Sequence, residues 1–126
     1  MKHFAALCLS LLLVVPLPAA AQYAMDLSNL VRAIRLADVG RDLENLDRAQ
    51  SVYVTRVSRL AGIRLQGALL DRALGARQRT RHVIQSVVGG SRVAMKALAA
   101  HGEALEDVIF LTTTNDGTAM LYVDDR

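Results

Sequence analysis

Residues 107–125 read DVIFLTTTNDGTAMLYVDD, two runs rich in β-branched and aromatic residues that flank the cluster NDG at 115–117. Glycine takes a positive φ angle at no steric cost, so a short Asn/Asp/Gly cluster between two such runs predicts a β-hairpin. A hairpin alone is marginally stable in water. The rest of the chain must therefore supply elements that pack on it.

Two registers of this hairpin are compatible with the sequence. A two-residue loop at 116–117 would pair Leu111 with Tyr122 and leave both faces mixed. A type I turn followed by Gly117 as a left-handed bulge residue would pair Thr114 with Thr118. We expect the second register, because it gives the sheet one nearly all-aliphatic face with which to cover a core. That face holds Ile109, Leu111, Thr113, Ala119, Leu121 and Val123, and Phe110, Thr112, Thr114, Thr118, Met120 and Tyr122 lie on the other.

The first 21 residues have the pattern of a secretory signal peptide. A basic head that includes Lys2 precedes an apolar run over 4–15, two prolines and a set of small residues ending at Ala21. The apolar run is shorter than the roughly 20 residues that span a bilayer. We therefore expect cleavage after Ala21, a periplasmic or secreted product, and no transmembrane anchor after processing.

Processing would leave residues 22–126, which is 126 minus 21 or 105 residues, enough for a single small domain. The only cysteine, Cys8, lies in the signal peptide. Disulfides, thiol catalysis and cysteine metal sites are therefore excluded from the expected mature chain.

Apolar spacing predicts helices over 26–37, 42–49, 65–75, 76–88 and 92–101, and the β-branched stretch 51–58 predicts a strand. Asp26 or Ser28 is placed to cap the first helix and Ser91 the last. Glycines mark the expected helix ends: Gly40, Gly75, Gly102 and the pair 89–90, which we expect to form a left-handed C-cap. The residues expected to face inward from the three later helices include Leu65, Leu69, Leu70, Ala73, Leu74, Val83, Ile84, Val87, Val88, Ala94, Met95 and Leu98.

Helices that precede a hairpin favour an α+β fold. We expect an N-terminal helix, one strand, two or three helices and the C-terminal hairpin, with the helices on one face of a small three-stranded sheet. The order of the strands stays open. If residues 52–57 join an edge of the hairpin, Arg56 and Arg59 would help to protect an exposed edge.

The C-terminal pattern resembles that of an uncharacterised group of short exported bacterial proteins. Its elements are Leu98, Gly102, the dipeptide at 107–108, the Asp-Gly-Thr at 116–118 and the closing Leu-Tyr-Val-Asp at 121–124. This resemblance implies a fold and an export route and no reaction. A weaker resemblance, to the PepSY domain, rests on a helix that precedes a hairpin with an aspartate-glycine turn.

Catalytic and metal-binding patterns are sparse. His82 and His101 are 19 residues apart and fit no HExxH or similar ligand spacing. No serine lies in a G-x-S-x-G elbow, and no glycine-rich phosphate loop is present. We therefore expect no enzyme, no metal and no cofactor. The alternative is a small secreted enzyme that uses the acidic residues from Glu103 to Asp107 for acid/base chemistry.

Charge is the remaining signal. Residues 48–96 carry ten basic and one acidic side chain, and residues 97–126 carry one basic and six acidic. The functional interpretation is an anion site for an envelope component or an unknown acidic protein partner. We expect no nucleic acid as a partner, because the chain is expected to be exported and its mature part has no tryptophan and only four aromatic residues for stacking. The other interpretation is that the basic helices neutralise the acidic C-terminal block. The candidate binding residues are Arg72, Arg77, Arg79, Arg81 and His82.

Overall fold

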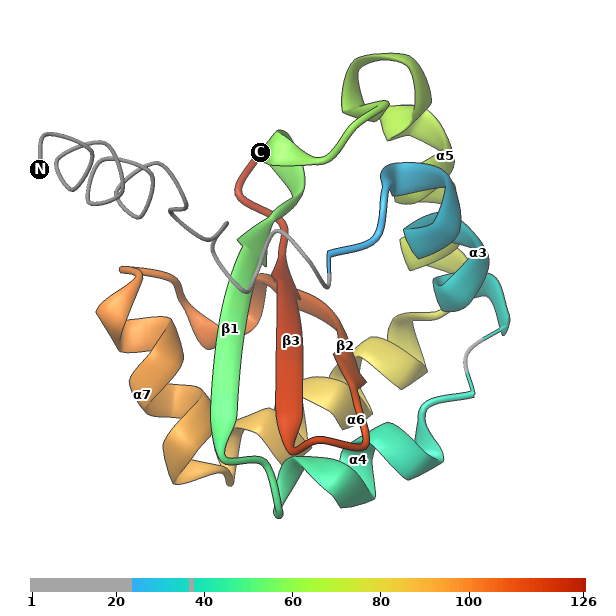
Figure 1. The fold of residues 1–126 in the computed structure, drawn as a ribbon. Helices are drawn as coiled ribbons and strands as arrows, with labels where there is room; N and C mark the ends of the chain where they lie inside the picture. The colour runs from blue at the N-terminus through green and yellow to red at the C-terminus, as the bar shows by residue number, and fades with distance from the viewer. Residues whose placement is uncertain (1–23, 37) are drawn as a thin grey trace, which may run out of the picture.

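The computed structural model describes residues 24–36 and 38–126 (Figure 1). The predicted signal peptide, residues 1–21, and Ala37 at the end of the first predicted helix lie outside them. The described helices are α3 (Leu27–Leu36), α4 (Gly40–Leu46), α5 (Ile63–Ala76), α6 (Gln78–Gly89) and α7 (Arg92–Ala100). The strands are β1 (Ser51–Arg56), β2 (Val108–Thr113) and β3 (Thr118–Val123), and short 3-10 turns η1 (Val57–Arg59) and η2 (Leu105–Asp107) flank β1 and β2. The α+β class and the order of elements are confirmed.

The three strands form one mixed sheet in the order β1-β3-β2. β3 lies in the centre, antiparallel to β2 and parallel to β1 (Figure 1). The strand predicted over 51–58 thus joins the β3 edge of the hairpin. Its last residues form η1 instead, and Leu60 closes this turn with a hydrogen bond from its N–H to the carbonyl of Val57 (3.0 Å).

The hairpin has the register with Gly117 as the left-handed residue. The N–H of Thr114 donates to the carbonyl of Thr118 (2.9 Å), and Leu111 pairs with Leu121. Gly117 has a φ angle of +86°, a value that residues with a side chain rarely adopt. This register is confirmed, and the two-residue loop that would pair Leu111 with Tyr122 is wrong. A bulge between Val108 and Phe110 then shifts the pairing at the far end of β2.

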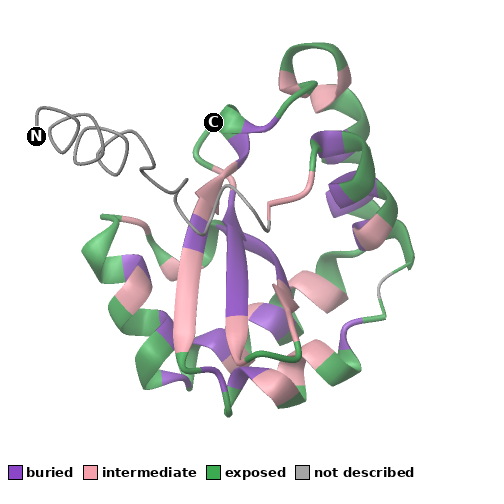
Figure 2. Ribbon diagram, in the orientation of Figure 1, coloured by how far each residue is buried: buried purple, intermediate pink, exposed green. Residues whose placement is uncertain are grey.

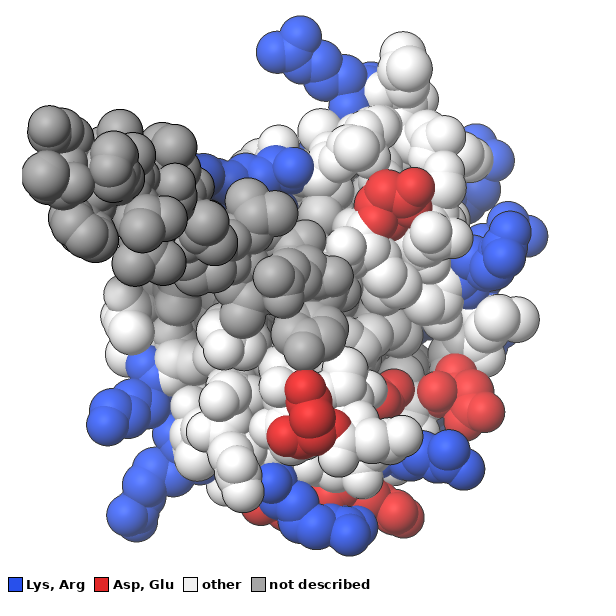
Figure 3. All heavy atoms as spheres, in the orientation of Figure 1, with Lys and Arg blue, Asp and Glu red and all other residues white. Residues whose placement is uncertain are grey.

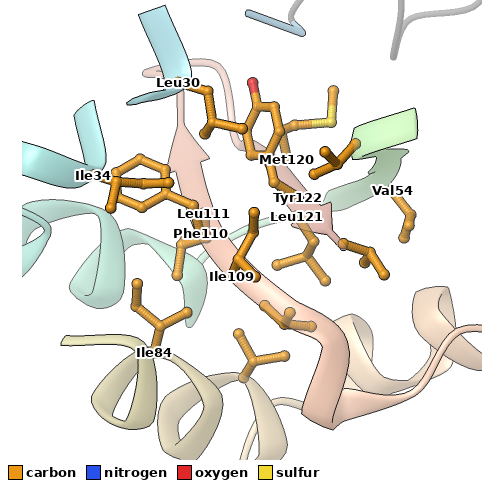
Figure 4. Packing of buried hydrophobic residues seen from close by; sticks show 14 of the residues in the cluster. Leu30, Ile34, Val54, Ile84, Ile109, Phe110, Leu111, Met120, Leu121 and Tyr122 are labelled. Atoms are coloured by element: carbon orange, nitrogen blue, oxygen red, sulfur yellow. The ribbon is translucent and has the colours of Figure 1, made fainter. Parts of the chain in front are cut away.

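Helices α4, α6 and α7 cover one face of the sheet, as expected (Figure 1). The other face is also apolar and buried, since Phe110, Met120 and Tyr122 are 4%, 1% and 0% exposed (Figure 2). Figure 4 shows Leu30 and Ile34 of α3 beside the rings of Tyr122 and Phe110, with Ile84 of α6 on the Ile109 side. Helix α3 therefore covers the second face of the sheet, for which the sequence predicted a half-polar surface.

Two helix starts have different outcomes. The carboxylate of Asp26 accepts a hydrogen bond from the N–H of Asn29 (3.0 Å), so the predicted cap of α3 is confirmed. Gly40, expected to end this helix, instead begins α4. Glycine destabilises mainly the middle of a helix, so it is tolerated at the first residue. The predicted helix over 42–49 accordingly begins two residues earlier and ends at Leu46.

The left-handed helix end lies at Gly102 and not at residues 89–90. Gly102 has a φ angle of +67°; its N–H donates to Ala99 and the N–H of Glu103 to Leu98, which is the Schellman pattern. Gly90 has a φ angle of −85°, so the left-handed cap expected there is wrong. A Cβ on Gly89 would lie 3.0 Å from Leu105, and this close approach explains a glycine at that position. The predicted cap of α7 is confirmed by a hydrogen bond from the N–H of Ala94 to Ser91 Oγ (3.2 Å).

Several apolar residues expected to face inward are exposed. Leu65 is 91% exposed and Leu69 46%, because α5 packs through a different stripe formed by Leu70, Ala73 and Leu74. Val83 on α6 (45%) and Met95 on α7 (36%) are exposed for the same reason: one side of each helix meets the sheet, through Ile84 and Val88 on α6 and Ala94 and Leu98 on α7. The helices themselves are confirmed, and the width of their buried faces was overestimated.

Arg126 joins the end of the chain to α5. Its Nε and Nη2 donate to the two carboxylate oxygens of Asp124 (2.8 and 2.9 Å), and Nη2 also pairs with Asp71. Nη1 lies 3.5 Å from the carbonyl of Gly67. The hydrogen bonds from Arg126 hold the pKa of Asp124 below its ordinary value of 3.8. They raise the pKa of Arg126 in turn.

This contact predicts a pH-dependent stability. A carboxylate whose pKa is lowered by folding stabilises the folded state above its unfolded pKa, and the stabilisation is lost as the pH falls below that value through the folded pKa. In Arg126→Gln we expect the free energy of unfolding at pH 7 to fall by about 1 kcal/mol or less. The difference from the native chain should shrink below pH 3.8, the ordinary value for Asp124. Urea unfolding at pH 7 and at acid pH measures this.

The control is Arg92→Gln, because Arg92 is an exposed residue of α7 with no ion pair among the described residues. It should leave the pH dependence unchanged. A loss in Arg126→Gln that is equally large at pH 7 and in acid would contradict the role of Asp124.

Candidate functional site

Helices α3 and α5 lie side by side at one end of the molecule (Figure 1). The hydroxyl of Ser28 donates to Gln66 Oε1 (2.8 Å), and the N–H of Leu27 donates to the carbonyl of Ala61 (3.1 Å), so the starts of the two helices are joined. Between them lies a hollow of about 850 Å³, adjoined by a smaller one of about 300 Å³ that shares Val31, Arg35, Leu69 and Ala76. We call the two together the basic groove.

The lining of the basic groove combines positive charge with apolar surface. Four arginines contribute to it, with Ser28 and Gln66 as neutral polar groups, and Leu36 and Leu69 supply exposed apolar surface. No acidic residue is among its lining residues. The arginines are Arg32 and Arg35 from α3, Arg72 from α5, and Arg77 from the junction of α5 and α6.

The placement of Arg32 and Arg35 follows from the helical repeat of α3. The inner side of this helix is taken by Leu27, Leu30, Val31 and Ile34, all at most 7% exposed. Residues 32 and 35 are three apart and fall together on the outer side. In Figure 3, basic side chains stand out along the edge of the molecule where α3 lies.

Arg77 is held in place by the end of α3. Its Nη2 donates to the carbonyl of Arg35 (2.7 Å), in the last turn of α3, where carbonyl groups lack partners within the helix. A cation there also interacts favourably with the negative end of the helix dipole. Arg77 therefore both fixes α3 against the junction of α5 and α6 and adds charge to the groove.

The structure separates the five predicted binding residues. Only Arg72 and Arg77 line the basic groove. Arg79 and His82 are exposed on α6, and within residues 24–36 and 38–126 no hydrogen bond or ion pair joins either to another side chain. Arg81 has a structural contact, since its Nη2 donates to the carbonyl of Glu106 (3.0 Å) in η2. Gln85 supports the same turn by donating to the carbonyls of Glu106 and Val108 (2.9 and 3.0 Å).

Neutralisation between the basic and acidic blocks is limited in the described part of the chain. Arg56 Nε pairs with Glu103 (3.2 Å), and its Nη2 donates to the carbonyl of His101 (3.0 Å). The remaining ion pairs described are those of Arg126. None of the five predicted residues pairs with a carboxylate there. The charge of the basic groove is therefore not cancelled by direct contacts.

The acidic residues considered for catalysis do not come together in a hollow. Glu103 is engaged by Arg56, and the carbonyl of Asp107 accepts the N–H of Asp124 (2.8 Å). Neither Glu106 nor Asp107 lines any of the hollows described here. His101 ends α7, where its Nδ1 lies 2.9 Å from the carbonyl of Ala97. Among the residues that the structure describes, no three His, Cys, Asp or Glu side chains gather in a way that could hold a metal ion.

The sequence missed Arg32 and Arg35 as groove residues. Their signal was local, two arginines three apart on the polar side of an amphipathic helix, and it is common on solvated surfaces. They line a groove only because α3 packs beside α5. The residues that join the two helices, Ser28 and Gln66, are 38 positions apart in the chain. Local periodicity does not encode that contact.

Comparisons of this chain with protein-family models, with curated proteins and with solved structures find no match. The resemblance to short exported proteins and to PepSY domains therefore stays a prediction. Within the described residues, no helix is both long and apolar enough to cross a membrane.

Proposed function

We propose that the protein is a small non-enzymatic binding domain of the bacterial periplasm or secretion space, and that the basic groove is its binding site for an anionic envelope component or an acidic partner. The observation that carries this proposal is the lining of the groove: four arginines, two leucines and no acidic residue. The signal peptide predicted at 1–21 supports a function outside the cytoplasm.

The chemistry of the lining supports an anion as the ligand. Each guanidinium offers several N–H donors in a plane that matches carboxylate and phosphate oxygens. Clustered like charges in a concavity also raise the local concentration of counter-ions and speed the encounter with an anionic partner. Leu36 and Leu69 would add apolar contact to a ligand that is not purely ionic.

The test is retention on an anionic matrix. We expect the triple variant Arg32→Gln, Arg35→Gln and Arg72→Gln to elute at lower salt than the native protein, because it has three fewer positive charges to hold the matrix. Salt weakens the retention of both proteins, since charges that face solvent are screened over about 8 Å at physiological ionic strength. Arg77 stays unchanged in this variant, since its hydrogen bond to Arg35 holds α3. Elution salt and melting temperature are measured together, and the melting temperature should remain close to native.

A matched control removes the same charge elsewhere. Arg41, Arg92 and Lys96 are exposed residues of α4 and α7 that do not line the groove. Their triple change to glutamine should lower the elution salt much less. Equal losses in the two triples would show that net charge alone retains the protein and would refute the groove as a site.

A further inference from the structure

Large exposed apolar side chains gather at the outer side of α3 and α5. Leu65 is 91% exposed, Leu36 71% and Leu69 46%. Leu65 and Leu69 are four residues apart on α5, so they lie one turn from each other on the same side of the helix. Leu69 and Leu36 both line the basic groove, and Leu65 continues this apolar surface beyond it.

The degree of exposure indicates what can cover these residues. A leucine that is 91% exposed contacts almost nothing in its own protein, so its cover must close around it from nearly every side. A folded partner would need a pit shaped for each leucine. The hydrocarbon boundary of a bilayer closes around a protruding side chain without such a pit, and leucines beside arginines are the composition of surfaces that lie in the membrane interface.

The charges beside the leucines match an anionic headgroup layer. Arg64 directly precedes Leu65 and is exposed, and Arg32, Arg35 and Arg72 line the adjoining groove. No acidic residue is among the lining of the groove or of the small hollow at Leu65. Phosphate-bearing lipids thus meet donors without a carboxylate among these lining residues, and the exposed Asp71 of α5 is paired with Arg126.

From this combination we infer that the outer side of α3 and α5 docks the protein onto a lipid surface with anionic headgroups. The arginines of the basic groove and Arg64 bind the headgroups, and Leu36, Leu65 and Leu69 enter the interface. The inference rests on the proposed function, because it names the anionic component that the groove binds. It concerns attachment to a surface and requires no helix that spans the membrane.

Binding to vesicles tests the inference. Native and variant proteins are produced in the same cells and purified without further processing, so they share the same N-terminal residues. Only differences in binding between native and variant proteins are interpreted. Sedimentation with phosphatidylglycerol/phosphatidylcholine vesicles should exceed that with phosphatidylcholine alone. Leu65→Ser should reduce binding to the anionic vesicles about tenfold, the order expected for withdrawing one leucine from an apolar phase. Leu65→Phe should restore it.

Leu65 does not line the groove, so Leu65→Ser should leave retention on the anionic matrix unchanged. The control is Val93→Ser, because Val93 is 44% exposed and belongs to α7, a helix that lies away from α5 (Figure 1). Neither change should alter the fold, which circular dichroism checks.

The possible failures are distinguishable. Matrix retention that depends on the arginines, with no preference for anionic vesicles or with vesicle binding unchanged by Leu65→Ser, would overturn the lipid inference and leave the proposed function standing. Retention that does not depend on Arg32, Arg35 and Arg72 would overturn both. Equal losses of vesicle binding in Leu65→Ser and Val93→Ser would also overturn the docking side.

Discussion

Replacement of Leu121 by alanine is expected to lower the free energy of unfolding by about 2–5 kcal/mol, the cost of removing buried methyl groups and leaving a cavity. Leu121 lies in the central strand, is 0% exposed, and pairs with Leu111 on one side and Val54 on the other. Domains of this size have a total stability of about 5–15 kcal/mol. Urea unfolding followed by circular dichroism measures the loss.

The control is the same chemical change at an exposed site. Leu65→Ala removes the same atoms from a side chain that is 91% exposed, and we expect an effect within about 0.5 kcal/mol. Comparable losses in Leu121→Ala and Leu65→Ala would contradict the position of β3 in the core.

Phe110→Ala is expected to cost about 3–5 kcal/mol and tests the second face of the sheet. Phe110 is 4% exposed and lies on the face opposite Leu111, where Figure 4 shows its ring beside Ile34. If α3 covers this face, the losses in Phe110→Ala and Ile34→Ala should not add in the double variant, because the two side chains share one contact. The same urea unfolding measures all three variants.

Strict additivity in this double-mutant cycle would mean that α3 does not pack on Phe110. A pair that is distant in the fold supplies the comparison: Phe110→Ala combined with Met95→Ala, since Met95 is 36% exposed on α7. Those two changes should add within about 0.5 kcal/mol.

The parts of the fold that were predicted correctly are those that neighbouring residues determine. Gly117 needs its positive φ angle for the turn itself, so the cluster at 115–117 specified both the hairpin and its register. The hydroxyl of Ser91 reaches an N–H only three residues away, and this cap was equally local. In both cases the interacting groups lie within one turn of the chain.

The wrong details have a common physical origin in packing between distant segments. Residues 65, 69, 70, 73 and 74 offer two apolar stripes on α5, and which of them is buried depends on where α3 and the sheet lie. From sequence alone, the glycine pair at 89–90 and the single Gly102 are equally suitable for a left-handed helix end. The choice of Gly102 for the left-handed position is visible only in the hydrogen bonds of Gly102 and Glu103.

The candidate site was predicted in part for the same reason. The positive block at 48–96 pointed to arginine as the binding residue, and Arg72 and Arg77 do line the basic groove. Arg81 does not line the groove; its partner is a backbone carbonyl of η2, 25 residues further along the chain. Charge density along a sequence does not separate arginines that hold turns from arginines that face solvent.

The order β1-β3-β2 has a consequence for the way the chain folds. β3, the strand between the other two, comes last of the three, and its pairing of Ser51 with Thr118 spans 118 minus 51 or 67 residues. Until residues 118–123 are available, β1 and β2 have no common neighbour. β2 and β3 can pair locally through their hairpin, whereas the addition of β1 closes a long loop, and such non-local pairing slows folding relative to local pairing.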